Sequence, residues 1–235
     1  MSGPTPTCIE EIQHVYYINL ADRTDRKELV EAELRSIGIR DPKRFDAIRT
    51  RNGAIGCSLS HIRLLETAKR GRWPHILIVE DDIQFTQPQV FVDQANEFFQ
   101  SGLHYDVVLF AGNNFPPYTQ PLPCAARVTR CQTTTGYFVR AEYYDTLIEN
   151  MREGVYALMQ NPDLHSTYAI DKYWFRLQAR DNWFLITPLT VTQRPSYSDI
   201  EKREINYTPA MLDLSKAGFM TQIKRQQRQA NLRIS

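Results

Sequence analysis

Three consecutive acidic residues, Glu80, Asp81 and Asp82, are the strongest chemical signal in this sequence. They follow an apolar run, His75 to Val79, which is typical of a buried β-strand. Ligands of open α/β sheets bind outside the carboxyl ends of the strands, where these carboxylates would emerge. Ionising three adjacent carboxylates is costly, and a bound cation relieves that cost. Because hard oxygen donors favour Mg²⁺ or Mn²⁺, the sequence predicts a metal site rather than a solvated acidic turn.

The elements around this strand predict the fold class. Strand patterns alternate with helical patterns, which indicates an α/β domain with a mostly parallel central sheet flanked by helices on both faces. The expected strands are 15–20, 45–48, 75–82, 105–111, 137–139 and 183–187, and the expected helices are 22–37, 58–70, 88–100, 142–151 and 169–178.

Two internal segments and both ends are expected to lie outside these elements. Residues 53–56 are expected to form a turn, and residues 112–131, with four prolines, a long irregular loop that serves as a lid or binding wall. The domain is placed at residues 15–208. An N-terminal tail, 1–14, precedes it, and a helical basic tail, 209–235, follows it.

Composition limits the classes of partner. The net charge of +1 produces no global field for nucleic acid. No apolar stretch is long enough to cross a bilayer, and the amino terminus lacks a secretory signal, so a cytoplasmic location is expected. From Ser215 onward there are five cationic residues and no acid. We expect this tail to be a solvated helix end; weak peripheral contact with the cytoplasmic face of a membrane is the alternative.

The four cysteines, Cys8, Cys57, Cys124 and Cys131, include no Cys-x-x-Cys pair. A structural zinc site is therefore not expected. In a reducing compartment all four are expected to be free thiols. A disulfide between Cys124 and Cys131 is the alternative in an oxidising one.

The acidic strand also resembles the first strand of response-regulator receiver domains. In such a domain a later strand delivers a phosphoacceptor aspartate, but the corresponding strand here ends in Phe110, Ala111 and Gly112, which accept no phosphoryl group. A receiver domain also begins with its acidic strand, whereas more than seventy residues of patterned sequence come first here. This interpretation is rejected.

Taken in order, the motifs resemble glycosyltransferase family 25, which includes bacterial lipooligosaccharide galactosyltransferases and procollagen hydroxylysine galactosyltransferases. The likeness covers most of the chain and weakens over residues 84–103 and 112–131. The matching blocks are Ile18-Asn19-Leu20 with Arg23, Asp25 and Arg26; Gly56-Cys57-Ser58-Leu59-Ser60-His61; Glu80-Asp81-Asp82; Thr135-Gly136-Tyr137; Ala169-Ile170-Asp171; and Pro188 through Ser198-Asp199-Ile200-Glu201.

The resemblance implies a GT-A-like architecture with a smaller acceptor-binding half. It also implies inverting transfer of a hexose, galactose in this family, from a UDP-sugar to a hydroxyl of a glycan or hydroxylysine-type acceptor. Mn²⁺ or Mg²⁺ would act as a Lewis acid on the departing diphosphate. The alternative is a catalytically silent module of the same fold that binds a nucleotide sugar or glycan.

Roles for the acidic residues follow from the resemblance and from strand geometry. Alternation places Glu80 and Asp82 on one side of the strand and Asp81 on the other, if the strand extends that far. Asp82 is the first candidate for a metal ligand. Asp81 is a second ligand or a structural brace, and Glu80 contacts the metal, the ribose or the sugar.

Further donor-binding residues are expected at the ends of the first strand and in the second motif. Arg23 and Arg26 begin a helix and are expected to meet uridine or phosphate; a solvated helix face with acidic partners is the alternative. His61 is assigned to the donor, with packing as the alternative. The remaining donor-binding candidates are Asn19, Leu20, Ser60 and Gln193.

An inverting transfer needs a base that removes the acceptor proton. Asp171 is the candidate, and helix capping is its alternative role. No histidine follows His165 to supply the late metal ligand that GT-A enzymes often have. The acceptor is assigned to Gly136, Tyr137, Trp174, Ser198 and Asp199. Tyr173 and Trp174 could stack on a sugar ring, and packing in the core is their alternative.

Overall fold

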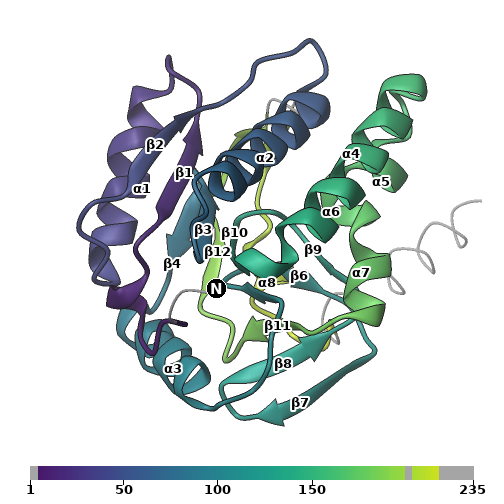
Figure 1. Ribbon diagram of the computed structural model, residues 1–235. Helices are drawn as coiled ribbons and strands as arrows, with labels where there is room; N and C mark the ends of the chain where they lie inside the picture. The colour runs from purple at the N-terminus through teal and green to yellow at the C-terminus, as the bar shows by residue number, and fades with distance from the viewer. Residues whose placement is uncertain (1–4, 199–202, 217–235) are drawn as a thin grey trace, which may run out of the picture.

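The computed structural model describes residues 5–198 and 203–216. An eight-stranded sheet forms its centre, in the order β2-β1-β3-β10-β5-β11-β8-β7 (Figure 1). Strands β10 and β8 run antiparallel to their neighbours, whereas the other strands share one direction. The strands are β1 (Val15–Asn19), β2 (Lys43–Asp46), β3 (His75–Glu80), β5 (Val107–Leu109), β7 (Tyr118–Leu122), β8 (Ala125–Val128), β10 (Gly136–Arg140) and β11 (Trp183–Ile186).

Helices cover both faces of the sheet, which confirms the predicted α/β class (Figure 1). Helices α1 (Thr24–Ser36) and α3 (Pro88–Gln100) pack on one face. Helices α2 (Gly53–Arg70), α4 (Tyr144–Gln160), α6 (Ile170–Tyr173) and α7 (Phe175–Arg180) pack on the other.

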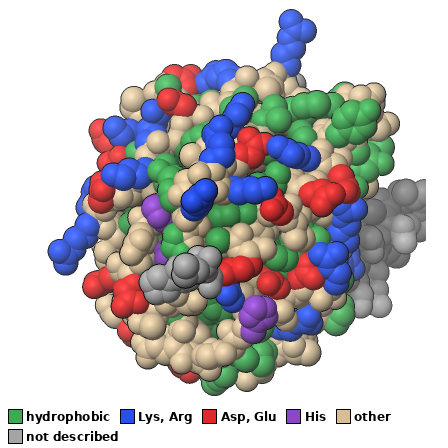
Figure 2. All heavy atoms as spheres, in the orientation of Figure 1, with side chains coloured by type: hydrophobic (Ala, Val, Ile, Leu, Met, Phe, Trp, Pro, Cys, Tyr) green, Lys and Arg blue, Asp and Glu red, His purple; other side chains and the backbone are tan. Residues whose placement is uncertain are grey.

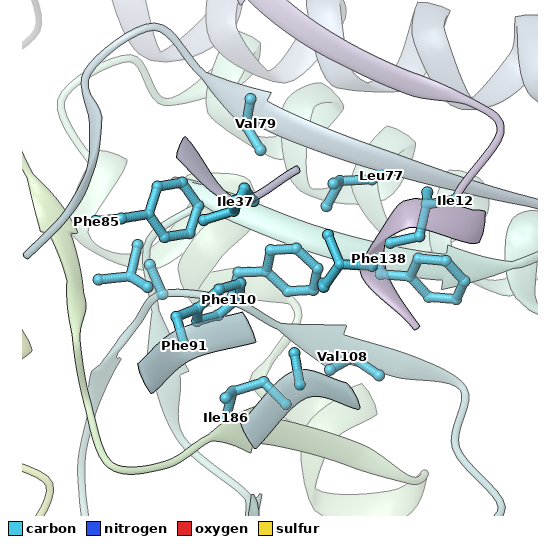
Figure 3. Packing of buried hydrophobic residues seen from close by; sticks show 14 of the residues in the cluster. Ile12, Ile37, Leu77, Val79, Phe85, Phe91, Val108, Phe110, Phe138 and Ile186 are labelled. Carbon is cyan, nitrogen blue, oxygen red and sulfur yellow. The ribbon is translucent and has the colours of Figure 1, made fainter. Parts of the chain in front are cut away.

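Side-chain alternation along β3 supplies both cores. Leu77 and Val79 point to the α1 and α3 face, where they pack with Phe110 and Phe138 (Figure 3). Ile76 and Ile78 belong to the opposite core. Because β3 is buried on both faces, it reads in the sequence as a continuous apolar run.

The predicted turn at residues 53–56 is wrong, because these residues already form the first turn of α2. The Asn52 side chain caps this helix by accepting hydrogen bonds from the backbone N–H groups of Ala54 and Ile55, at 3.0 and 3.4 Å. Gly56 is needed for close packing, since a Cβ atom there would lie 2.4 Å from the carbonyl oxygen of Ile48. The helix therefore starts five residues earlier than predicted.

The predicted irregular loop at residues 112–131 is also wrong. It contains β7, β8 and a short strand, β6 (Asn113–Asn114), which pairs with β9 (Cys131–Gln132). Strand β7 is the edge of the sheet, so no further strand pairs with its outer side. Pro121, which has no backbone N–H to donate, is therefore tolerated there. The segment extends the sheet instead of forming a lid.

The predicted helix at 169–178 is divided into α6 and α7, with α5 (His165–Tyr168) before them. The described residues also include a separate pair of strands beside the acidic residues, in which β4 (Ile83–Phe85) is antiparallel to β12 (Val191–Gln193). The remaining elements are η1 (Ile9–Glu11), η2 (Ala141–Tyr143), β13 (Ser196–Ser198), β14 (Arg203–Ile205) and α8 (Thr208–Met211).

The structure bears on several expectations about the ends of the chain, the cysteines and the surface. Ile9 and Ile12, in the segment assigned to an N-terminal tail, lie in the core. All four cysteines are free thiols, as predicted. Within the described part of the chain, no helix is long and apolar enough to span a membrane. Most of the basic tail lies outside the described residues. On the face shown in Figure 2, basic and acidic side chains are interspersed, consistent with the small net charge.

Candidate active site

A pocket of about 390 Å³ lies at the carboxyl ends of β1, β2 and β3. Its walls come from the residues that follow these strands, from the first half of α2 and from the end of β12. This is the position predicted from the acidic strand end. Of the residues predicted to bind donor or metal, those that line the pocket are Leu20, Arg23, Arg26, Ser60, His61, Glu80, Asp81, Asp82 and Gln193.

Asp81 is held by two hydrogen-bonding partners. Its Oδ1 accepts from Arg26 Nη1 at 2.9 Å, and its Oδ2 accepts from Asn19 Nδ2 at 2.8 Å. Burial raises the pKa of the Asp81 carboxyl, and the Arg26 charge and the Asn19 hydrogen bond act in the opposite direction. Both carboxylate oxygens are occupied, which favours the predicted role of brace over that of metal ligand.

Asp82 has one oxygen without such a partner among the described residues. Its Oδ1 is buried and, among the described residues, has no hydrogen-bond partner. Burial, followed by the negative charges of Glu80 and Asp81, raises the pKa of the Asp82 carboxyl to about 8. The backbone N–H of Arg194 donates to the Asp82 carbonyl oxygen at 2.6 Å, which fixes the turn after β3. An unpartnered, buried carboxylate oxygen on a residue that lines a pocket is an arrangement that a bound cation would complete.

Glu80 occupies a different environment. Its Oε1 accepts a hydrogen bond from the Thr134 hydroxyl at 2.7 Å, and its Oε2 accepts from Gln193 Nε2 at 3.2 Å. Burial raises the pKa of the Glu80 carboxyl, but the nearby His61 together with hydrogen bonds from Thr134 and Cys57 outweighs burial and lowers it. Glu80 therefore remains ionised at neutral pH, whereas Asp82 is the acid that retains a proton when no cation is bound.

Two residues of the second motif are buried in the pocket wall. Ser60 Oγ accepts a hydrogen bond from the Ile48 backbone N–H and donates to the Gly56 carbonyl oxygen, both at 2.8 Å. Ser60 therefore anchors the loop between β2 and α2, and its hydroxyl is already engaged. His61 is fully buried, with Nδ1 2.8 Å from the Tyr137 hydroxyl oxygen.

Cationic side chains surround the acids. Arg23 forms an ion pair with Asp25 at 3.0 Å, which matches the alternative of a helix face with acidic partners. It also lines the pocket. The sequence interpretation missed three further arginines and one cysteine in the pocket lining. The arginines had a detectable signal, since two flank a threonine after the second predicted strand and one follows Gln193. These residues are Arg49, Arg51, Arg194 and Cys57.

Asp171 lies in the first turn of α6 and is not among the residues that line the pocket. Its Oδ2 accepts from the Thr133 backbone N–H and from Lys172 Nζ, each at 3.1 Å. It makes no side-chain cap to its own helix. The neighbouring residue Thr134 donates to Glu80, so one short segment connects Asp171 to the acidic site. Catalysis by Asp171 stays a prediction.

Three of the residues assigned to the acceptor are buried, and their assignment stays a prediction. Tyr137 and Trp174 are fully buried, and Trp174 Nε1 donates to the Cys131 carbonyl oxygen at 2.9 Å. Gly136 is buried as well, and a Cβ atom there would lie 2.9 Å from Ile83 Cδ1. For Trp174, this burial favours the alternative role, packing in the core.

The two other acceptor candidates come from the carboxyl-terminal part of the chain. Ser198 is the last residue of β13. Asp199 lies outside the described residues. Their assignment stays a prediction.

The family comparison agrees with this site. Residues 50–160 match the family model of glycosyltransferase family 25, described as LPS biosynthesis protein. This segment is a glycosyltransferase family 25 region. It contains α2, β3 and all three acidic residues, so the family resemblance predicted from the motifs is confirmed over the segment. No curated protein matches the chain significantly.

Solved structures show partial likeness. Mannose-1-phosphate geranyltransferase from Thermus thermophilus is 10% identical over 73% of this chain and 58% of its own, with a TM-score of 0.39. A glycosyltransferase involved in glycosylation of the major capsid of PBCV-1 is 12% identical over 75% and 82%, with a TM-score of 0.42. The nucleoside-diphosphate-sugar pyrophosphorylase from Vibrio cholerae is 20% identical over 76% and 75%, with a TM-score of 0.38. None of these likenesses identifies a substrate for this chain, which spans 58% of the geranyltransferase.

Proposed function

We propose that this chain is a glycosyltransferase that moves a hexose from a UDP-sugar to a hydroxyl of a glycan acceptor. The observation that carries the proposal is the unpartnered, buried Asp82 oxygen in a pocket that combines acids with arginines, inside the segment that matches the family. Galactose is the donor sugar that the family resemblance implies. The family description favours a lipopolysaccharide-type acceptor.

The residues fit a hard divalent cation, Mn²⁺ or Mg²⁺. Asp82 would hold it, because its Oδ1 has no partner among the described residues and its negative charge is opposed by two neighbouring acids. Magnesium-type ions need only one or two protein carboxylates when substrate phosphates supply other oxygens. The ion would supply Lewis-acid stabilisation of the leaving diphosphate.

The remaining pocket residues suit the other parts of a UDP-sugar. Arg23 and Arg51 line the same pocket as the acids and can pair with phosphate oxygens. Arg194 lines it too, but its guanidinium donates to Glu33 at 2.6 Å. Leu20 and Ile48 form an apolar part of the wall that suits the flat face of a base. Arg26 is engaged with Asp81 and therefore positions that carboxylate.

Asp171 is proposed as the general base. In the reaction the acceptor oxygen forms a bond to the anomeric carbon as the bond to the diphosphate breaks on the opposite side of the ring. The proton of the acceptor hydroxyl passes to the Asp171 carboxylate. Thr133 supports this role by holding one carboxylate oxygen through its backbone N–H at 3.1 Å.

The test is release of UDP from a panel of UDP-sugars in the presence of Mn²⁺, with a glycan acceptor mixture and without one. Wild type is expected to release UDP from one donor preferentially, and Asp82→Ala is expected to lose at least about 100-fold, the scale of a lost charge-stabilising group. Asp93→Ala, at an exposed acid on α3 outside the pocket lining, is the matched control.

Two results would contradict the proposal. If wild type and Asp82→Ala release UDP equally slowly while both bind UDP, the chain is a silent nucleotide-sugar-binding module. If Asp171→Asn retains full transfer at every pH between 6 and 8, Asp171 is not the base and belongs to the structural link with Thr133.

A further inference from the structure

A second group of metal-ligating side chains lies in the wall of the pocket. Cys57, His61 and Glu80 each offer a ligand atom, and these atoms all lie within 4.8 Å of one another. Cys57 and His61 are four residues apart on α2 and therefore share a helix face. Glu80 reaches them from the end of β3. All three also line the pocket.

Two of the three separations among these atoms match a tetrahedral ion. Typical zinc bonds are about 2.3 Å to sulfur, 2.0 Å to nitrogen and 2.1 Å to oxygen, which at tetrahedral angles separate sulfur from oxygen by about 3.6 Å and nitrogen from oxygen by about 3.4 Å. Here Cys57 Sγ lies 3.6 Å from Glu80 Oε1, and His61 Nε2 lies 3.6 Å from the same oxygen. The third separation, from Cys57 Sγ to His61 Nε2, lies within 4.8 Å and would be about 3.5 Å around a bound ion.

His61 is the second observation that points to a ligand. Its side chain is fully buried, and Nε2 has no hydrogen-bond partner among the described residues. Nδ1 is hydrogen-bonded to the Tyr137 hydroxyl at 2.8 Å. When Nδ1 carries the proton and donates it, the Nε2 lone pair points toward Glu80. Metal-binding histidines are oriented by a hydrogen bond of this kind on the other ring nitrogen.

The carboxylate is oriented as well. Thr134 donates to Glu80 Oε1 at 2.7 Å, and Gln193 holds Oε2 at 3.2 Å. The Cys57 thiol also donates to Oε1, so loss of the thiol proton frees a lone pair of that oxygen for an ion. Two of the three ligand side chains thus have outer partners that fix their direction. Burial raises the pKa of the Cys57 thiol, so the thiol alone remains protonated and inert.

We propose that Cys57, His61 and Glu80 bind one borderline-soft divalent ion of the zinc class, with an open fourth position that faces the pocket. On binding, the Cys57 thiol releases its proton to solvent and the thiolate forms the bond to the ion. Sulfur and imidazole nitrogen distinguish this site from the hard, all-oxygen site at Asp82. The inference does not depend on sugar transfer.

Cobalt(II) is the probe, because a thiolate bound to Co²⁺ produces an intense charge-transfer absorption that oxygen ligands do not. The full chain, freed of metal and kept reduced with a phosphine, is titrated with CoCl₂ and then with ZnCl₂. Wild type is expected to show a band that saturates at one ion per chain and disappears when zinc displaces cobalt. Cys8→Ser, at a cysteine outside the pocket lining, is expected to behave like wild type.

Variants separate ligands from structural residues. Cys57→Ser is expected to lose the band, and Glu80→Gln to keep a weaker band with reduced affinity. Tyr137→Phe is expected to keep the band with about 10–100-fold weaker binding, the usual effect of losing an outer partner. Thermal unfolding of each variant verifies that it is folded; if Cys57→Ser is not, Glu80→Gln and Tyr137→Phe decide the matter.

Three results would overturn the site. These are a wild-type chain without the band at saturating cobalt, a band that survives in folded Cys57→Ser, and an affinity unchanged in both Glu80→Gln and Tyr137→Phe. Inactivity toward every UDP-sugar would leave the cobalt result untouched, so failure of the proposed function and failure of this site are distinguishable.

Discussion

Replacement of Asp82 by asparagine should stabilise the metal-free protein in a pH-dependent way. The pKa of this carboxyl is raised from 3.8 to about 8 in the folded chain. Between these values the folded chain retains a proton that the unfolded chain has released. Wild-type stability is therefore highest below pH 3.8 with respect to this group, and it falls as pH rises toward 8.

The size of the effect follows from the same displacement. Each tenfold change in proton affinity corresponds to about 1.4 kcal/mol, so ionisation of Asp82 at pH 7 opposes folding by up to about 4 kcal/mol. Because the side chain is partly exposed, we expect an effect of about 2–4 kcal/mol. Asparagine cannot ionise. At pH 7 Asp82→Asn should exceed wild type in unfolding free energy by that amount, and at pH 4 the two should be nearly equal.

Urea unfolding in EDTA, followed by tryptophan fluorescence, measures this difference, since Trp174 and Trp183 are fully buried. Asp163→Asn, at an exposed acid, is the control and should change stability little at either pH. At a Mn²⁺ concentration one hundred times its dissociation constant, wild type should gain about 2.7 kcal/mol and Asp82→Asn much less. A variant whose advantage is the same at pH 4 and pH 7 would refute the argument from buried charge.

Three further predictions concern positions outside the acids. Burial, and secondarily the charge of His14, lowers the pKa of His75 from 6.5 to about 4. The folded chain therefore binds this proton less tightly than the unfolded chain, and stability falls as pH drops below 6.5. In urea unfolding at pH 5, His75→Gln should lessen this loss of stability by about 2 kcal/mol. Gly112→Ala would place a Cβ atom 2.2 Å from Cys131 Sγ and should cost about 1–3 kcal/mol, measured the same way. Trp174→Phe should destabilise by a similar amount without changing the acceptor KM, and a raised KM with unchanged stability would restore its role in stacking.

Local sequence patterns predicted much of the sheet. The run before Glu80 could be recognised as β3 because a strand buried on both faces is apolar at every position. The same logic located the pocket, since the carboxyl ends of parallel strands meet at one edge. Strand pairs far apart in the chain could not be predicted. The reversed strand β10 pairs between β3 and β5, and β8 extends the sheet, because long-range pairing is decided by which edges remain unpaired.

Sequence spacing by itself predicted that three carboxylates end one strand. That Cys57 and His61 share a helix face came from the structure, since the expected helix began only at residue 58. Only the tertiary structure decided which carboxylate has partners: Arg26 and Asn19, from other elements, occupy Asp81 and leave Asp82 Oδ1 without one among the described residues. The structure alone likewise brought Glu80 against α2. Side-chain direction is set locally by the backbone, but the neighbours that satisfy or desolvate a charge arrive from segments distant in sequence.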